Sequence, residues 1–330
     1  MFNFILTIKD KINYMGKITR YASRITKNMS SFTDNFDRWF RNLIESYRTS
    51  YSHLFPPERD EFFLENTREL LCLYMEKKDN IETFGVNVLK RFRHEKSLLN
   101  KVHSYGFRLK DETHLAEKLI RKKIENPHIE IGKENFFSEI TDLAGLRILQ
   151  LYKTHIKDIH EFICNCKEWE LSREPVAYNF SPRFLKIFKE LDMEVKEKST
   201  GYSSAHYVVN DVEHKNCYCE IQVRTLFEEG WSEIDHTFNY PRQKPGKVCQ
   251  TLLETLKRVC DVAVYIADQI PDIYYEEKKN PETMEDMKPG IAVLQANLIR
   301  NLQAELEYLK EKLKTSTGYT INEDSYPVIL

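Results

Sequence analysis

The chain of 330 residues is 41% hydrophobic and 12% aromatic, so it can bury the core of one large domain or of two smaller ones. Its formal net charge is only -2 although 30% of its residues are charged, which excludes a uniformly basic surface for nucleic acid and requires any anion site to be local. The seven cysteines form no Cys-x-x-Cys pair, which argues against a disulfide framework and against a zinc site.

The N-terminal segment has only a short apolar run before Lys9 and Asp10, shorter than the core of a signal peptide. No apolar stretch approaches the roughly 20 residues that span a bilayer. We therefore expect a cytoplasmic protein without a membrane partner.

Residues 1–88 are predicted to form a helical N-terminal extension. Apolar residues recur at helical spacing in residues 37–47 and 61–78. The Pro56-Pro57 pair separates the two runs, because proline cannot continue a helix. The extension carries no recognisable chemistry.

Residues 89–240 show alternating strand and helix patterns. Strands are predicted at residues 146–152, 205–211 and 217–227, and helices at residues 154–166 and 181–191. Strands interleaved with helices favour an α+β domain, in which a mixed β-sheet of about five strands is covered by helices.

Residues 241–330 return to a helical pattern after a loop rich in proline and glycine. Leucines recur every three or four residues near the end of the chain, at positions 294, 298, 302, 306, 309 and 313. They predict one apolar stripe on a long helix. The stripe could pack on its own domain or on a second subunit, and the sequence does not decide between these.

Basic residues gather between Lys90 and Lys123, in a chain whose charges otherwise balance. Such a run is usually a solvated helix face, but it also marks where an anionic ligand would bind. Within it, four residues at helical spacing are expected to project from one face: Lys110, His114, Lys118 and Arg121. A row of this kind suits the phosphates of a nucleotide.

Two later segments add acidic and basic side chains near predicted strands. Asp142 and Arg147 flank Gly145, where they form either a salt bridge or a site in which Asp142 binds Mg²⁺ and Arg147 stacks on a base. In the strand at residues 217–227, alternation places three polar side chains on one face: Glu220, Gln222 and Arg224.

The Gly201-Tyr202 turn before the strand at residues 205–211 is either a plain turn or an aromatic platform for a ligand. A cationic row, two carboxylates for a metal and an aromatic turn together indicate phosphoryl or pyrophosphoryl transfer between nucleotides.

Five segments in this order resemble the synthetase domain of the RelA/SpoT family, the alarmone synthetases. They are Arg108-Leu109-Lys110 with Lys118, Arg121 and Lys122; Asp142-Leu143-Ala144-Gly145-Leu146-Arg147; Gly201-Tyr202-Ser203-Ser204-Ala205-His206; Glu220-Ile221-Gln222-Val223-Arg224-Thr225; and Trp231-Ser232-Glu233-Ile234-Asp235-His236. The match covers residues 108–240 and is closest to the small single-domain members. It implies a nucleotidyltransferase-like core at residues 89–240, between helical regions at 1–88 and 241–330.

The resemblance implies a pyrophosphokinase, in which ATP gives its β,γ-diphosphate to the 3′-hydroxyl of GDP or GTP. The residues implied for ATP are Arg108, Lys110, Lys118, Arg121, Lys122 and Arg147, with the adenine between the two arginines. Asp142 and Glu220 would bind Mg²⁺, and Glu220 would polarise the attacking hydroxyl. The residues implied for the acceptor are Tyr202, His206, Gln222, Arg224 and His236, with Tyr202 stacked on the base.

The chain departs from the family pattern at three positions. Ser203 stands where the family commonly has Arg or Lys, so one cation is expected to be missing beside the acceptor phosphates. His114 replaces a frequent Ser, and Asp235 replaces the usual Glu. Ser203 and the basic run at residues 90–101 make an adenine nucleotide or the 3′ end of tRNA an alternative acceptor. An inactive nucleotide-binding regulator is a separate alternative function.

No pattern of the family's hydrolase domain precedes the synthetase segment, so the resemblance implies synthesis without hydrolysis. An enzyme of this kind needs restraint from elsewhere. The helical ends are expected to provide it, through a homo-oligomer, an inhibitory partner or autoinhibition.

Overall fold

The structure is a computed structural model, which describes residues 36–178, 184–198, 201–239 and 245–279, and scattered helical positions between residues 292 and 315. The chain divides into two compact units. The described residues of Met1–Asn80 and Lys110–Ile140 form the first unit, and those of Ile81–Leu109 and Thr141–Leu330 form the second. Each unit combines segments that are distant in the sequence, and the domain boundaries after residues 88 and 240 remain a prediction.

The first unit is helical. Its elements are a helix over residues 36–51, η1 (Pro57–Arg59), the first part of α2 (Asp60–His94), α3 (Glu112–Glu125) and α4 (Phe136–Glu139). Its core consists of buried aromatic and aliphatic side chains, among them Phe40, Ile44, Phe55, Tyr74, Leu115, Ile120 and Phe136. The predicted interruption at Pro56-Pro57 is confirmed, because the helix over residues 36–51 ends before it and α2 begins after it.

The second unit is built on a seven-stranded mixed sheet of order β1-β2-β7-β6-β4-β5, with β3 paired to β6. The strands are β1 (Ser104–Leu109), β2 (Ala144–Gln150), β3 (Trp169–Leu171), β4 (Val176–Tyr178), β5 (Glu194–Lys196), β6 (Ser204–Asp211) and β7 (Tyr218–Thr225). The β2–β7 and β4–β5 pairs are parallel and the others are antiparallel. The predicted mixed sheet is confirmed, and it is larger than expected because β3, β4 and β5 are too short to show alternation.

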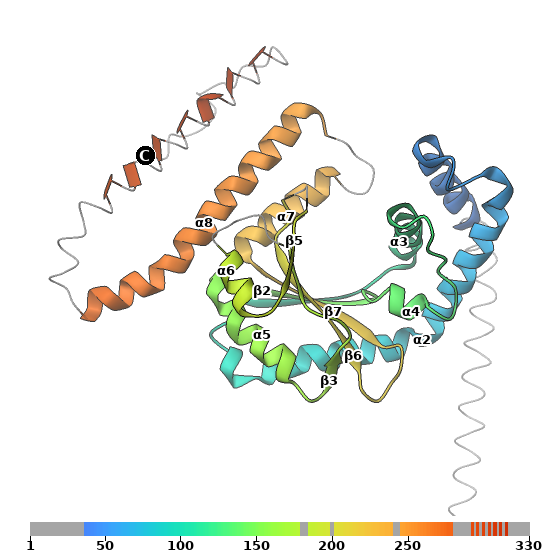
Figure 1. The fold of residues 1–330 in the computed structure, drawn as a ribbon, viewed down its shortest axis with the longest axis horizontal. Coiled ribbons are helices and arrows are strands. Elements are labelled where there is room, and N and C mark those ends of the chain that lie inside the picture. The colour runs from blue at the N-terminus through green and yellow to red at the C-terminus, as the bar shows by residue number, and fades with distance from the viewer. Residues whose placement is uncertain are drawn as a thin grey trace, which may run out of the picture. The chain divides into compact units, whose positions relative to one another are not determined.

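Helices cover both faces of this sheet (Figure 1). They are η2 (Lys96–Leu98), η3 (Lys153–His155), α5 (Ile156–Asn165), α6 (Leu185–Glu190), α7 (Leu226–Asn239) and α8 (Lys247–Lys279), together with the last part of α2. The apolar face carries Ile148, Tyr207 and Ile221, and α5 packs on it with the His160 ring 5.8 Å from the Tyr207 ring. The opposite face is polar and lies under α7.

Two close contacts fix the layers on the apolar face. A Cβ at Gly85 would lie 2.5 Å from the ring of Phe107, so glycine lets α2 approach β1 closely. Further along α2, the ring of Phe92 lies 4.8 Å from Phe162 of α5 and 6.1 Å from Trp169 of β3. These contacts show that the end of α2 belongs to the core of the second unit.

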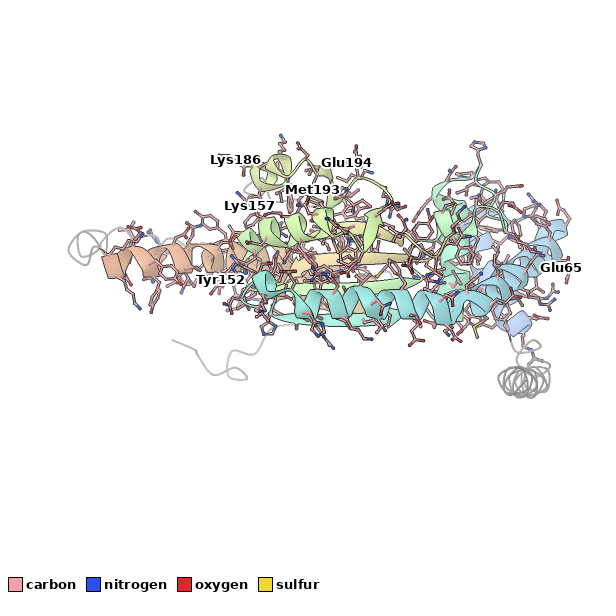
Figure 2. The ribbon with its side chains drawn as sticks, turned by 90° about the horizontal axis from the view of Figure 1, so that it is seen from below. Glu65, Tyr152, Lys157, Lys186, Met193 and Glu194 are labelled. Atoms are coloured by element: carbon pink, nitrogen blue, oxygen red, sulfur yellow. The ribbon has the colours of Figure 1, made fainter. Side chains whose placement is uncertain are left out.

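The helix α6 and the strand β5 complete this side of the sheet (Figure 2). Lys157 of α5 pairs with Glu190 of α6 at 3.0 Å, and the Tyr207 hydroxyl donates to the Met193 sulfur at 3.8 Å. Figure 2 shows Lys157, Lys186 and Met193 together on this side. One surface ion pair thus joins α5 to α6, and a buried hydroxyl of β6 holds the residue that precedes β5.

The helix α8 is anchored on the opposite side of the second unit. The indole of Trp231 in α7 donates to the carbonyl oxygen of Leu253 at 2.9 Å, and the Asp268 carboxylate accepts from the backbone N–H of Thr154 at 3.3 Å. The predicted helical C-terminal region is confirmed for α8. Of the six leucines of the predicted apolar stripe, only Leu306 lies in the described part of the chain. Within that part, no helix is both long and apolar enough to cross a membrane.

Candidate active site

The polar face of the second unit brings together side chains from four strands. The register pairs Gly106 of β1 with Arg147 of β2, Arg147 with Gln222 of β7, and Gln222 with His206 of β6. Glu220 and Arg224 lie on the same face as Gln222, because side chains on a strand alternate. The predicted grouping of Glu220, Gln222 and Arg224 is what the strand β7 displays.

These side chains form a closed ring of hydrogen bonds. The Arg224 guanidinium donates to the Tyr202 hydroxyl at 2.7 Å, and it also donates to the side-chain carbonyl of Gln222. The Tyr202 hydroxyl lies 2.9 Å from His206 Nε2, and His206 Nδ1 lies 3.2 Å from Glu220 Oε1. Gln222 closes the ring by donating to Glu220 Oε2 at 2.7 Å.

The ring has one consistent direction of donation. Burial raises the pKa of Tyr202 against the lowering effect of the Arg224 charge, so the Tyr202 hydroxyl keeps its proton and can donate to His206. With a proton on Nδ1, His206 then donates to Glu220. Both routes from Arg224 therefore end on the Glu220 carboxylate, whose two oxygens are fixed as acceptors.

Acidic residues of α7 hold the two arginines of this face. Glu229 forms ion pairs with Arg147 and, at 3.1 Å, with Arg224, and Glu233 pairs with Arg147 at 2.7 Å. Glu229 is thus an acidic bridge between the two guanidinium groups, with its side chain only 13% exposed. The sequence suggested that Arg147 either pairs with Asp142 or stacks on a base. Neither interpretation included Glu229 or Glu233, because acidic residues on a helix are usually exposed to solvent.

A hollow of about 150 Å³ lies on β1 and β2 between Arg108 and Arg147. Its walls are Gly106, Phe107, Arg108, Gly145, Leu146, Arg147 and Gln222. The glycines make it possible, since a Cβ at Gly145 would lie 3.5 Å from the Arg108 side chain and one at Gly106 would lie 3.6 Å from Arg147 Cβ. This hollow, which we call the arginine slot, has room for a flat group flanked by planar guanidinium groups.

Of the two predicted metal carboxylates, Glu220 lies on β7 and Asp142 lies just before the neighbouring strand β2. Asp142 is half-buried in the turn two residues before β2 begins, and Glu220 is paired with Gly145 of β2 across the parallel register. Oxygen ligands of this type suit Mg²⁺, which commonly takes one or two carboxylates together with substrate phosphates. The described residues contain no group of three or more potential metal ligands, and a site of the Mg²⁺ type does not require one.

The predicted phosphate-binding cations belong to the first unit. Helix α3 begins at Glu112, and its N-cap Asp111 accepts from the backbone N–H of His114 at 3.0 Å. Lys110 therefore precedes the helix and is buried, which corrects the expectation that it belongs to one helical row. His114 lies in the first turn of α3, as expected, and its side chain contacts the Asp111 carboxylate.

The other three cations of this set lie along α3: Lys118, Arg121 and Lys122. Each is partly exposed, and Lys122 pairs with Glu139 at 3.5 Å. The opposite side of the helix buries Leu115, Ala116 and Ile120, which explains why the cations face outward.

Ser203, where one cation was expected to be missing beside the acceptor phosphates, is a buried residue of the second unit. It is 3% exposed, and its hydroxyl donates to Glu228 at 2.5 Å. Lys153 pairs with the same carboxylate oxygen at 2.6 Å, so a buried cation already lies beside Ser203. The neighbouring Gly201 has φ of 77°, a conformation that favours glycine.

His236, the last predicted acceptor residue, is exposed in the final turns of α7 and is not part of the hydrogen-bond ring. The residues that sequence reasoning missed are Glu229 and the buried Glu228. Both lie shortly after Arg224-Thr225 in the sequence. The two successive glutamates were the only feature of the sequence that could have indicated a role for them.

The fold and this site define an α+β domain whose mixed sheet has one polar face, with a slot between two arginines. The family model described as the region found in RelA / SpoT proteins matches residues 107–245. The match agrees with the resemblance that the motifs predicted for residues 108–240.

Two curated relatives come from Bacillus subtilis (strain 168). GTP pyrophosphokinase YjbM is 24% identical over 62% of this chain and 86% of its own length. GTP pyrophosphokinase YwaC is 26% identical over 54% of this chain and 76% of its own length.

Among solved structures, small alarmone synthetase 1 from Bacillus subtilis has a TM-score of 0.45 at 21% identity, over 63% of this chain and 96% of its own. The structure of that protein bound to its product pppGpp has a TM-score of 0.44 at 22% identity, over 62% of this chain and 95% of its own.

Proposed function

We propose that the protein is a pyrophosphokinase, which transfers the β,γ-diphosphate of ATP to the 3′-hydroxyl of GDP or GTP. The observation that carries the proposal is the polar face itself, where the arginine slot and a doubly hydrogen-bonded Glu220 lie on adjoining strands within the RelA/SpoT region. The family relatives named GTP pyrophosphokinases support the reaction class.

In the proposed arrangement, the adenine of ATP occupies the arginine slot between Arg108 and Arg147. Guanidinium groups stack well on a purine, because they are planar and weakly hydrated. The triphosphate is bound by the cations Lys110, Lys118, Arg121 and Lys122. Asp142 and Glu220 would hold Mg²⁺, which supplies neutralisation of the phosphate charge.

The acceptor is proposed to lie on the other side of Glu220, against Tyr202, His206, Gln222, Arg224 and His236. Its 3′-hydroxyl oxygen attacks the β-phosphorus of ATP, and the bond from that phosphorus to the bridging oxygen of AMP breaks. The Glu220 carboxylate takes the hydroxyl proton and AMP leaves. The ring orients this carboxylate, since His206 and Gln222 each donate to one of its oxygens.

An acceptor screen tests the proposal. Purified protein is incubated with Mg²⁺, ATP labelled at the γ-phosphate, and one of GDP, GTP, ADP or tRNA. We expect label on a guanosine nucleotide together with release of AMP. Label on ADP or tRNA instead would contradict the guanine acceptor while keeping the chemistry, and a lack of transfer to any acceptor would favour an inactive regulator.

Glu220→Gln tests the catalytic carboxylate, because the amide keeps the shape and loses the charge. We expect transfer to fall by at least two orders of magnitude, in the range of general-base effects. ATP binding measured by calorimetry should be retained. Undiminished transfer in a folded variant would refute the role of Glu220.

A further inference from the structure

The first unit contains a cavity of about 450 Å³ that the proposed reaction does not use. It lies between the helix over residues 36–51, α2, α3 and the segment 129–135. Its apolar lining includes Phe40, Ile44, Phe55, Ile120 and Ile131. The volume falls in the range of roughly 300–1,000 Å³ that is typical of small-molecule sites, which are mostly apolar with a few polar groups.

The wall formed by residues 129–135 is held in place by two asparagine side chains. Asn135 accepts from the backbone N–H of Gly132 at 2.9 Å and donates to the carbonyl oxygen of Glu130 at 3.0 Å. Asn66 of α2 donates to the carbonyl oxygen of Ile131 at 3.0 Å. Because these bonds satisfy the loop backbone, the wall does not need to collapse into the cavity to find partners.

The lining of the cavity carries three cations and also two carboxylates, Glu130 and Glu134. The cations differ in their partners. Lys133 pairs with Glu69, and Arg59 lies 3.7 Å from Glu130. Lys123 donates to the backbone carbonyl oxygen of Ile129 at 3.0 Å, and in the described part of the chain it forms no ion pair with a carboxylate. Lys123 is therefore the lining cation best able to bind the anionic group of a ligand.

We propose that this cavity binds an amphipathic carboxylate, whose apolar body fills the cavity and whose anionic group contacts Lys123. Aliphatic and aromatic walls match the apolar body, and the Lys123 ammonium, which has no carboxylate partner among the described residues, matches a single negative charge.

The cavity is positioned to affect nucleotide binding through α3. Ile120 and Lys123 line the cavity, whereas their neighbours Arg121 and Lys122 belong to the proposed ATP-binding cations. A ligand that fixes one side of the helix therefore changes the free energy of binding at the other side, and the coupling is reciprocal. Only this regulatory part rests on the proposed function.

The binding test uses the full chain and sodium decanoate, below its micellar concentration, with decanol and decyltrimethylammonium as neutral and cationic matches. Trp39 reports on the site, because its ring lies 6.4 Å from that of Phe40, and the other tryptophans, Trp169 and Trp231, belong to the second unit. We expect a saturable change in tryptophan emission with decanoate, and at least tenfold weaker binding of the two matches. The same affinity for all three compounds would overturn the proposal.

Two charge variants locate the anion contact. Lys123→Met should weaken decanoate binding about tenfold and abolish the preference over decanol. Lys133→Met removes a charge that also lines the cavity but is already paired with Glu69. This variant should change the affinity for decanoate less than twofold. Equal effects of the two variants would show general electrostatic attraction and refute the assigned contact.

A filling variant tests the apolar part. Ile131→Trp should remove saturable decanoate binding, and unchanged binding in a folded variant would place the ligand elsewhere. If this variant does not fold, the comparison of Lys123→Met with Lys133→Met still decides the proposal.

The regulatory step is measured separately, as the change in ATP affinity when decanoate is saturating. We expect a change of at least threefold, which Lys123→Met should reduce. Decanoate binding is measured without nucleotide, so failure of the acceptor screen would leave the cavity proposal intact. Absence of decanoate binding would equally leave the proposed reaction intact.

Discussion

The buried ion pair between Lys153 and Glu228 provides the most direct test of how this fold is stabilised. The two side chains are 1% and 3% exposed and lie 2.6 Å apart. Glu228 also accepts from the Ser203 hydroxyl at 2.5 Å and from the backbone N–H of Thr225 at 2.8 Å. Removing the ammonium leaves a buried carboxylate with two neutral donors.

We expect Lys153→Met to lower the free energy of unfolding by about 3 kcal/mol, at the lower end of the range for a broken buried pair because two hydrogen bonds remain. The double variant Lys153→Met with Glu228→Gln should recover much of this loss, because it removes the uncompensated charge. Lys157→Met is the control, since it breaks an exposed pair with Glu190 and should cost at most about 1 kcal/mol.

Urea unfolding followed by circular dichroism gives the three values, with the slope compared among variants. The reasoning is refuted if Lys153→Met costs no more than Lys157→Met, or if the double variant is less stable than the single one.

The pH dependence supplies a second check on the same pair. Burial alone would raise the pKa of Glu228, but the charge of Lys153 and the hydrogen bonds to the carboxylate outweigh it and hold the pKa below its ordinary value. A lowered folded pKa contributes stability above the unfolded pKa of about 4.3, and this contribution is lost as pH falls through the folded value. The cost of Lys153→Met should therefore shrink as the pH falls below about 4.

Three further predictions concern the polar face and α8. Gly145→Ala adds a methyl group at ordinary contact distance from Arg108, so the stability of the protein should change little. The KM for ATP should rise severalfold, whereas the KM for the acceptor should stay constant. Equal rises in both KM values would contradict the arginine slot. Glu229→Gln removes the charge of the acidic bridge, and kcat/KM should fall about tenfold, which corresponds to about 1.4 kcal/mol. Unchanged kinetics would show that Arg147 and Arg224 do not need the acidic bridge. Burial raises the pKa of Asp268 against its hydrogen bonds from Thr154, so its stabilising contribution is full below the ordinary Asp pKa and is lost as pH rises through the folded value. Asp268→Asn should therefore gain stability relative to the parent between pH 4 and pH 7 in urea unfolding, and a constant difference would contradict the raised pKa.

The sequence predicted the elements whose patterns are local. The strands β2, β6 and β7 were expected because Ile, Val and Tyr alternate with other residues over seven or eight positions, and the alternation also placed Glu220, Gln222 and Arg224 on one face. The motifs around these strands indicated the family. In contrast, β3, β4 and β5 have three residues each and show no period.

The tertiary structure decided which partners the charged groups have. Glu229 lies 82 positions after Arg147, and nothing in the spacing indicates that α7 holds this arginine. The same holds for Ser203, which the motif placed beside the acceptor but which the chain buries against Glu228 and Lys153. Likewise, the cavity beside Lys123 exists only where four separate segments meet.

The sequence by itself determined the local conformations and the chemical types of the site residues, because backbone preferences and side-chain alternation act over a few positions. Only the packing of α7 on the sheet, and of the segment 129–135 on α2, decided which carboxylates compensate which cations. The physical reason is that an ion pair depends on distance in space and on burial, and residues far apart in the chain acquire both only when the chain folds.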